Sequence, residues 1–65
     1  MYYFYAIIER SFNFCVLKTG FGELQSAWDE ANRLQKQYPD LIEDADVLVF
    51  NTEKEQLEYL RNNTK

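Results

Sequence analysis

The chain has 65 residues, 46% of them hydrophobic and 17% aromatic, and its formal net charge is −4. This composition excludes an intrinsically disordered chain and favours one small globular domain spanning residues 1–65. One cysteine and no histidine exclude an internal disulfide, a zinc site built from cysteine and histidine, and catalysis by a histidine base.

The apolar N-terminal stretch is interrupted by Glu9 and Arg10 and is too short to span a membrane. We therefore expect a soluble cytoplasmic protein. We also expect no enzymatic activity, no cofactor and no bound metal, because so small a domain offers little room for a substrate cleft.

Two N-terminal segments, residues 2–9 and 12–19, are rich in aromatic and β-branched side chains, which is typical of strands. Polar Arg10, Ser11 and Asn13 allow a reversal between them, so the sequence predicts a β-hairpin. The following segment, Gly20-Phe21-Gly22, interrupts the pattern and predicts a turn.

A long amphipathic helix is predicted next, because apolar residues recur from Leu24 to Tyr38 at the spacing i, i+3, i+4 and i+7. Pro39 ends it, since the residue before a proline disfavours the helical conformation. An acidic connector then leads to the apolar residues 47–50, which predict a short strand.

The C-terminal segment begins with Thr52-Glu53-Lys54-Glu55, which has the form of a helix capping box. A second helix is therefore expected after it, with Leu57 and Leu60 facing inward. Residues 61–65 are expected to form a frayed tail.

This order of elements, ββαβα, predicts an α+β fold in which a three-stranded antiparallel sheet carries both helices on one face. We assign the helices to the face of Ala6, because a small residue lets a helix approach closely. The opposite face is then open to solvent and exposes Tyr3, Tyr5, Ile7, Cys15 and Leu17. An exposed apolar surface of this extent is typical of a binding site.

The expected contact residues fall into an apolar and an acidic group. The apolar contacts are Tyr3, Tyr5 and Leu17, and the acidic contacts are Asp40, Glu43, Asp44 and Asp46. Acidic side chains in this connector favour docking to a basic protein, by analogy with the charges of nucleic acid, or they serve only solubility. They lack the spacing of an EF-hand calcium loop.

Several short segments resemble the viroplasmin-like hybrid-binding domain found at the N-terminus of some ribonucleases H. They are Trp28-Asp29-Glu30-Ala31, Tyr38-Pro39, Phe50-Asn51-Thr52-Glu53 and Tyr59-Leu60. The resemblance implies a three-stranded antiparallel sheet with two helices. It also implies binding of an RNA–DNA duplex, with Trp28 and the strand tyrosines as stacking candidates.

The aromatic first strand, the order of elements, the size and the acidic charge are similar to small phage-encoded inhibitors, including an inhibitor of bacterial RNA polymerase and anti-CRISPR proteins. This resemblance implies a protein-binding inhibitor. Our leading hypothesis is an interaction protein from a phage or mobile element that inhibits a nucleic-acid-handling protein of a bacterial host. The alternatives are a nucleic-acid-binding domain of the viroplasmin type and a homodimer formed through the open sheet face.

Overall fold

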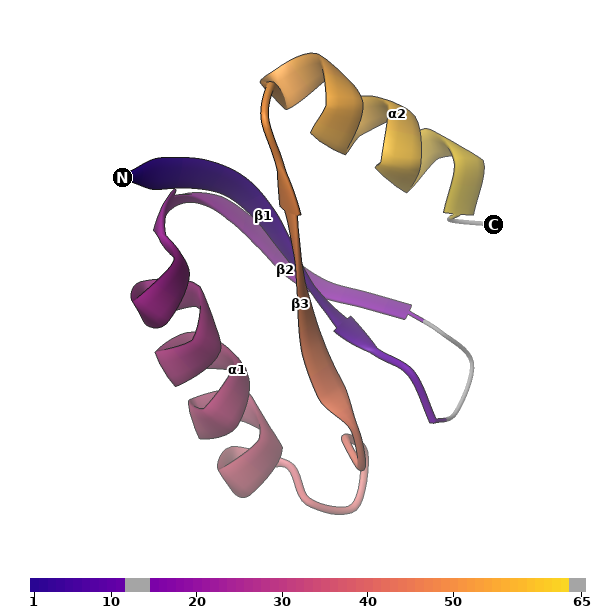
Figure 1. Cartoon of the computed structure of the whole chain (residues 1–65). Coiled ribbons are helices and arrows are strands. Elements are labelled where there is room, and N and C mark those ends of the chain that lie inside the picture. The colour runs from indigo at the N-terminus through magenta and orange to yellow at the C-terminus, as the bar shows by residue number, and fades with distance from the viewer. Residues whose placement is uncertain (12–14, 64–65) are drawn as a thin grey trace.

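A computed structural model describes residues 1–11 and 15–63 of the chain. The elements follow the order β1 (Tyr2–Glu9), β2 (Cys15–Glu23), α1 (Leu24–Gln37), β3 (Ala45–Phe50) and α2 (Glu53–Asn63) (Figure 1). The strands form an antiparallel sheet in the order β2-β1-β3, so the predicted α+β class and three-stranded sheet are confirmed.

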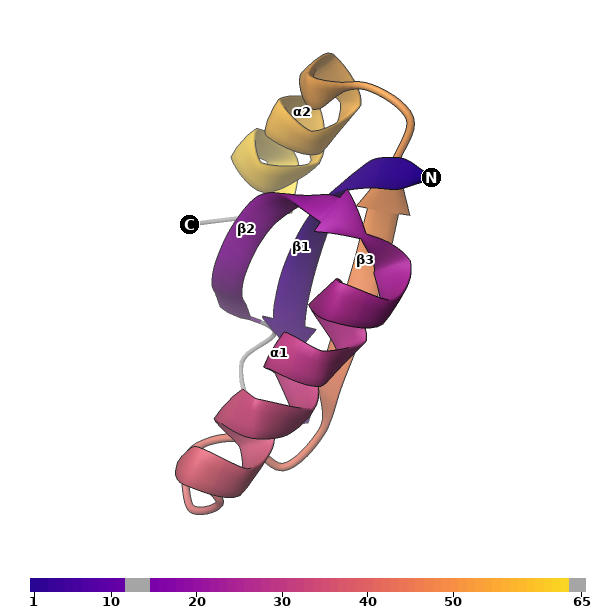
Figure 2. The same ribbon diagram turned by 90° about the vertical axis from the view of Figure 1, so that its left-hand side faces the viewer.

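Strand β1 lies in the centre of the sheet and pairs antiparallel with both neighbours. Strands β2 and β3 are therefore parallel to each other, with β1 inserted between them. Helix α1 connects them across one face in the right-handed sense that is usual for such crossovers (Figure 2).

Both faces of the second half of β1 are covered. Its last four residues, Ala6, Ile7, Ile8 and Glu9, are buried, with exposed fractions of 0%, 0%, 0% and 1%. Since successive side chains of a strand point to opposite faces, Ala6 and Ile8 are buried on one face, and Ile7 and Glu9 on the other. We call these the Ala6 face and the Ile7 face.

The two helices cover opposite faces, so the prediction that both lie on one face is wrong (Figures 1 and 2). Helix α1 lies on the Ile7 face, where its Glu30 pairs with Lys18, the residue opposite Ile7. Helix α2 lies on the Ala6 face, where its Tyr59 packs against Phe50. The sheet is thus the middle layer, and the predicted exposure of Ile7 is also wrong.

Strand β2 continues to Glu23, so the prediction of a turn at Gly20-Phe21-Gly22 is wrong. Cross-strand pairing decides this, because Gly20 lies opposite Tyr5 and Phe21 lies opposite Phe4. The predicted start of this strand at Phe12 and the turn residue Asn13 lie outside the described residues. The predicted end of the first helix before Pro39 agrees with α1 ending at Gln37, and the predicted end of the third strand agrees with β3 ending at Phe50. Strand β3 begins earlier than predicted, at Ala45 and not at residue 47.

Helix α2 begins as the capping motif predicts, with the Glu55 N–H donating to the Thr52 hydroxyl at 3.2 Å. The Glu55 carboxylate in turn accepts from the Asn51 N–H at 3.4 Å. Leu60 is half-buried, but Leu57 is 55% exposed, so its predicted inward orientation is wrong. The buried position of this helix is Gln56, and residues 61–63 of the predicted tail are helical.

Candidate interaction surface

Five aromatic side chains form a continuous row on the Ala6 face. Phe21, Phe4 and Phe50 lie directly opposite one another on β2, β1 and β3. The Phe4 and Phe21 rings are 4.6 Å apart, Tyr2 meets Phe21 edge-on at 5.7 Å, and Tyr59 lies 5.4 Å from Phe50. We call these five residues the aromatic row.

One end of the aromatic row is open to solvent. Helix α2 starts three residues after Phe50, so Tyr59 covers the β3 end of the row. At the β2 end, Tyr2 is 62% exposed and Phe21 is 56% exposed. Aromatic side chains are enriched at protein interfaces because they contribute a large apolar area at a low entropic cost.

The three apolar contacts expected from the sequence do not share one surface. Tyr3 and Tyr5 are half-buried on the Ile7 face, the side on which α1 packs. Leu17 is half-buried at a β-bulge, where the pairing shifts from Ile7 with Lys18 to Ile8 with Val16. The bulge lies at the opposite end of the hairpin from Tyr3, which pairs with Gly22.

The Tyr5 ring covers Gly20 across the hairpin, and this contact gives a prediction. A Cβ added at Gly20 would lie 2.5 Å from the Tyr5 hydroxyl oxygen and 2.7 Å from its Cζ. Gly20→Ala is therefore expected to lower the free energy of unfolding by about 1–3 kcal/mol, because the ring must leave its position. Urea denaturation of the purified variant measures the loss.

The matched control is Gly22→Ala, since a Cβ at Gly22 meets no atom within 4 Å. This substitution removes conformational freedom from the unfolded chain and is expected to leave stability unchanged or slightly raised. Equal losses in the two variants would contradict the role given to the Tyr5 ring.

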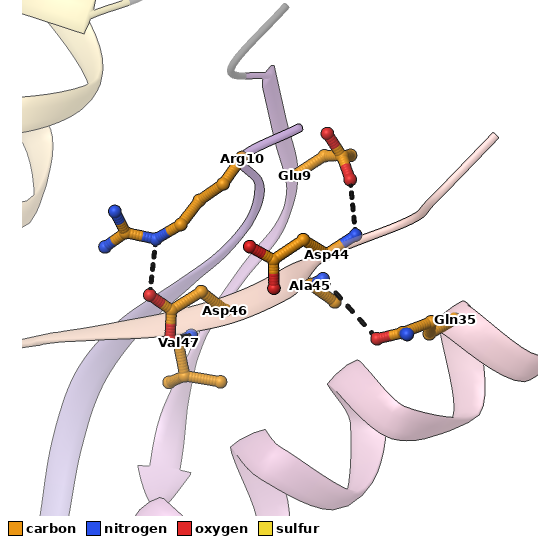
Figure 3. A network of polar contacts seen from close by, with 7 residues as sticks. All are labelled: Glu9, Arg10, Gln35, Asp44, Ala45, Asp46 and Val47. Atoms are coloured by element: carbon orange, nitrogen blue, oxygen red, sulfur yellow. Dashed lines mark hydrogen bonds and ion pairs between the residues drawn. The ribbon is translucent and has the colours of Figure 1, made fainter. Parts of the chain in front are cut away.

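The acidic connector is organised by the buried carboxylate of Glu9 on the Ile7 face. Oε2 of Glu9 accepts a hydrogen bond from the Asp44 N–H at 2.8 Å (Figure 3). The same oxygen accepts a hydrogen bond from the Glu43 N–H at 3.0 Å. On the helix side, Nε2 of Gln35 donates to the Glu43 carbonyl at 3.1 Å. These bonds fix the backbone before β3, so the connector has a defined shape.

The four predicted acidic contacts differ in their surroundings. Asp40, Glu43 and Asp44 are exposed. Asp46 is half-buried in β3, and its Oδ2 lies 2.5 Å from Nε of Arg10 (Figure 3). Three of the four carboxylates are thus presented to solvent at one end of the sheet, and the fourth is paired.

A second ion cluster ties α1 to β2. Nζ of Lys18 lies 3.5 Å from Oε1 of Glu30, which also accepts a hydrogen bond from the Arg33 guanidinium. The hydrogen bond from Arg33 lowers the pKa of Glu30, and the positive charges of Arg33 and Lys18 lower it further. The side chains of Lys18 and Arg33 are about half exposed, so the cluster orients α1 but contributes little stability.

The sequence analysis missed Tyr2, Phe21 and Glu9. The signal for Phe21 is the alternation Gly-Phe-Gly, which is compatible with a strand in which one glycine, Gly20, lies under the ring of Tyr5 on the neighbouring strand. The signal for Glu9 is an acidic residue that ends a strand with apolar residues on both faces.

In the part of the chain that the structure describes, we looked for a metal site, a substrate pocket and a membrane-spanning helix. No group of three or more metal-ligating side chains is brought together in residues 1–11 and 15–63. A groove of about 420 Å³ follows Leu57 along the outer side of α2, but helix α2 alone lines it. Among the helices described, none has the length and apolar character needed to span a membrane.

Comparison with known proteins gave no matching family model, no matching curated protein and no matching solved structure. The argument for function therefore depends on the surfaces of the molecule. Of these, the exposed end of the aromatic row is the most distinctive, because large apolar side chains on a small domain are usually buried.

Proposed function

We propose that the chain is a small interaction domain that binds a protein partner through the exposed end of the aromatic row. The observation that carries this proposal is the pair Tyr2 and Phe21, which remain 62% and 56% exposed while packing edge-on against each other. Two rings held in fixed positions on paired strands bind with little further loss of side-chain freedom, which favours affinity.

The partner is expected to surround an apolar centre with basic side chains. Glu23 lies opposite Tyr2 on the same face, and Glu53 and Glu55 follow Phe50 at the start of α2. All three are exposed, and the chain as a whole carries a net charge of −4. Complementary charge around an apolar centre accelerates association and selects the partner.

Proteins that hold nucleic acid fit this description, because their binding surfaces are rich in lysine and arginine. An acidic domain seated on such a surface competes with the nucleic acid and acts as an inhibitor. This is the mode of action we propose, and it agrees with the hypothesis of a phage or mobile-element protein acting in a bacterial host.

Direct binding of nucleic acid ranks below this proposal. The exposed rings of Tyr2 and Phe21 could stack on bases, but neighbouring Glu23, Glu53 and Glu55 would repel the phosphates. Self-association through the aromatic row is the third alternative. A salt titration with an RNA–DNA duplex separates the first two, since measurable affinity at low salt would favour nucleic-acid binding.

The decisive experiment is photo-crosslinking in cells that express the chain, with the reactive side chain placed at position 21. We expect a protein with a basic surface to be captured. The same side chain at position 38 is the control, because Tyr38 is also an exposed aromatic residue, 44% exposed, but lies at the end of α1. Capture of nucleic acid, or of the same products from both positions, would overturn the proposal.

The matched variants give the energetic test once the partner is known. Tyr2→Ser with Phe21→Ser is expected to weaken binding at least tenfold, as interface aromatic residues commonly do. Tyr38→Ser is expected to leave the affinity unchanged. Circular dichroism of each variant confirms that the fold is retained.

A further inference from the structure

Strand β3 forms one edge of the sheet, and its outward-facing backbone groups can be identified. The Arg10 N–H donates to the Asp44 carbonyl at 3.0 Å, in register with the pairing of β1 and β3. Hydrogen-bonded pairs alternate along an antiparallel ladder. The backbone groups of Ala45, Val47 and Val49 therefore point away from β1, towards the free edge.

Two of these three outward N–H groups are occupied by side chains. The Ala45 N–H donates to Oε1 of Gln35 at 3.4 Å. The Val47 N–H donates to Oδ1 of Asp46 at 2.8 Å, while the other oxygen of Asp46 pairs with Arg10 (Figure 3). A single carboxylate thus covers the centre of the edge and is itself held in place by Arg10, the residue that follows β1.

The sequence of β3 explains why such a cover matters. The strand reads Ala-Asp-Val-Leu-Val-Phe, so Asp46 is its only charged residue. Five of its six residues are apolar, and Val47, Val49 and Phe50 have high strand propensity. Short segments of this kind, with low net charge and no proline or glycine, tend to pair with other copies of themselves. Proteins blunt such edges with charged side chains.

We propose that Asp46, held by Arg10, closes the β3 edge against pairing with β3 of a second copy of this chain. We expect the pairing partner to be a second copy, because two antiparallel β3 strands place apolar residues opposite each other. In this arrangement the outward backbone groups of Val47 and Val49 on each strand face the backbone of the other strand. With Asp46 in place, the Val47 N–H is occupied and cannot donate to a second strand.

The test is the mass of Asp46→Ala in sedimentation equilibrium, compared with the wild type over a range of concentrations. The weight-average mass of Asp46→Ala is expected to rise above that of the wild type, towards twice the chain mass of 7.8 kDa. Association through the aromatic row would be present in both chains, so the difference between them reports on the edge. Asp46→Asn keeps an oxygen that can accept from the Val47 N–H and is expected to associate less than Asp46→Ala.

A second substitution shows where the copies meet. Val49 is 45% exposed on β3, and Val49→Lys in the Asp46→Ala chain is expected to restore the wild-type mass by placing like charges at the contact. Arg10→Met frees the carboxylate of Asp46 while keeping an apolar side chain. It is expected to associate more than the wild type but less than Asp46→Ala, and it replaces Asp46→Ala in the test if that variant does not fold. A folded Asp46→Ala chain with the mass of the wild type, or association unaffected by Val49→Lys, would overturn the proposal.

Discussion

Replacing Glu9 by alanine is expected to lower the free energy of unfolding by about 3–5 kcal/mol, because the N–H groups of Glu43 and Asp44 lose a charged acceptor. Glu9 is only 1% exposed, so the substitution also leaves a cavity beneath the connector. A 65-residue domain has a total stability of about 3–10 kcal/mol, so this loss is a large fraction of the total. Urea denaturation followed by circular dichroism measures the change.

The control for this prediction is Glu9→Gln. Its amide oxygen can accept the same two hydrogen bonds without the charge, so a smaller loss is expected. Glu43→Ala removes an exposed side chain from the same connector and is expected to change stability by less than about 0.5 kcal/mol. If Glu9→Gln were as destabilising as Glu9→Ala, the negative charge of Glu9, and not its hydrogen bonds to the connector, would be the dominant contribution.

Replacing Gln56 by glutamate is expected to lower the free energy of unfolding at neutral pH by about 3 kcal/mol. The Gln56 side chain is 6% exposed, and its Nε2 donates to the carbonyl oxygens of Tyr5 at 2.7 Å and Gly20 at 3.4 Å. A carboxylate there has no proton to donate and places its negative charge against two carbonyl dipoles. Thermal unfolding at pH 7 measures the loss.

The pH dependence of Gln56→Glu has a definite sign. A protonated glutamic acid regains one donor, so the deficit relative to the wild type is expected to shrink as the pH falls and to grow as it rises. Gln56→Met keeps the length of the side chain without a charge and is expected to cost less, with a deficit that does not change with pH. A deficit in Gln56→Glu that stays constant between pH 4 and pH 8 would contradict the proposed contacts.

Much of the fold follows from local patterns in the sequence. The apolar spacing that begins at Leu24 predicts α1, Pro39 predicts its end, and the Thr52 capping motif predicts the start of α2. These features act within one or two helical turns, so no knowledge of the tertiary structure is needed to read them. The α+β class follows from the order of the elements.

The placement of the helices could not be predicted in the same way. Strand β1 carries apolar residues on both faces, and Ala6 and Ile7 provide equally good sites for a helix. The sequence analysis assumed one covered face, as is common for antiparallel sheets, whereas a strand with continuous apolar residues is typical of a sheet covered on both sides. That assumption also directed attention to Tyr3 and Tyr5.

The candidate surface depended on a cross-strand contact that local patterns do not contain. Phe21 stands between two glycines, which locally indicate a turn, yet it lies on a strand because Phe4 and Tyr5 pair across from Phe21 and Gly20. The bulge at Leu17 changes the alternation along β2, and this shift cannot be read from β2 alone. The acidic connector, in contrast, lies within one segment and was found from the sequence.

The position of α2 has a consequence for the order in which the molecule assembles. Gln56 binds carbonyl groups of both β1 and β2, and Tyr59 packs on Phe50 of β3, so the surface that receives α2 exists only after all three strands have paired. The β1–β2 hairpin is local and needs no such prior step. We therefore expect the contacts of α2 to form on the native side of the folding barrier, so that their loss accelerates unfolding and leaves the folding rate almost unchanged.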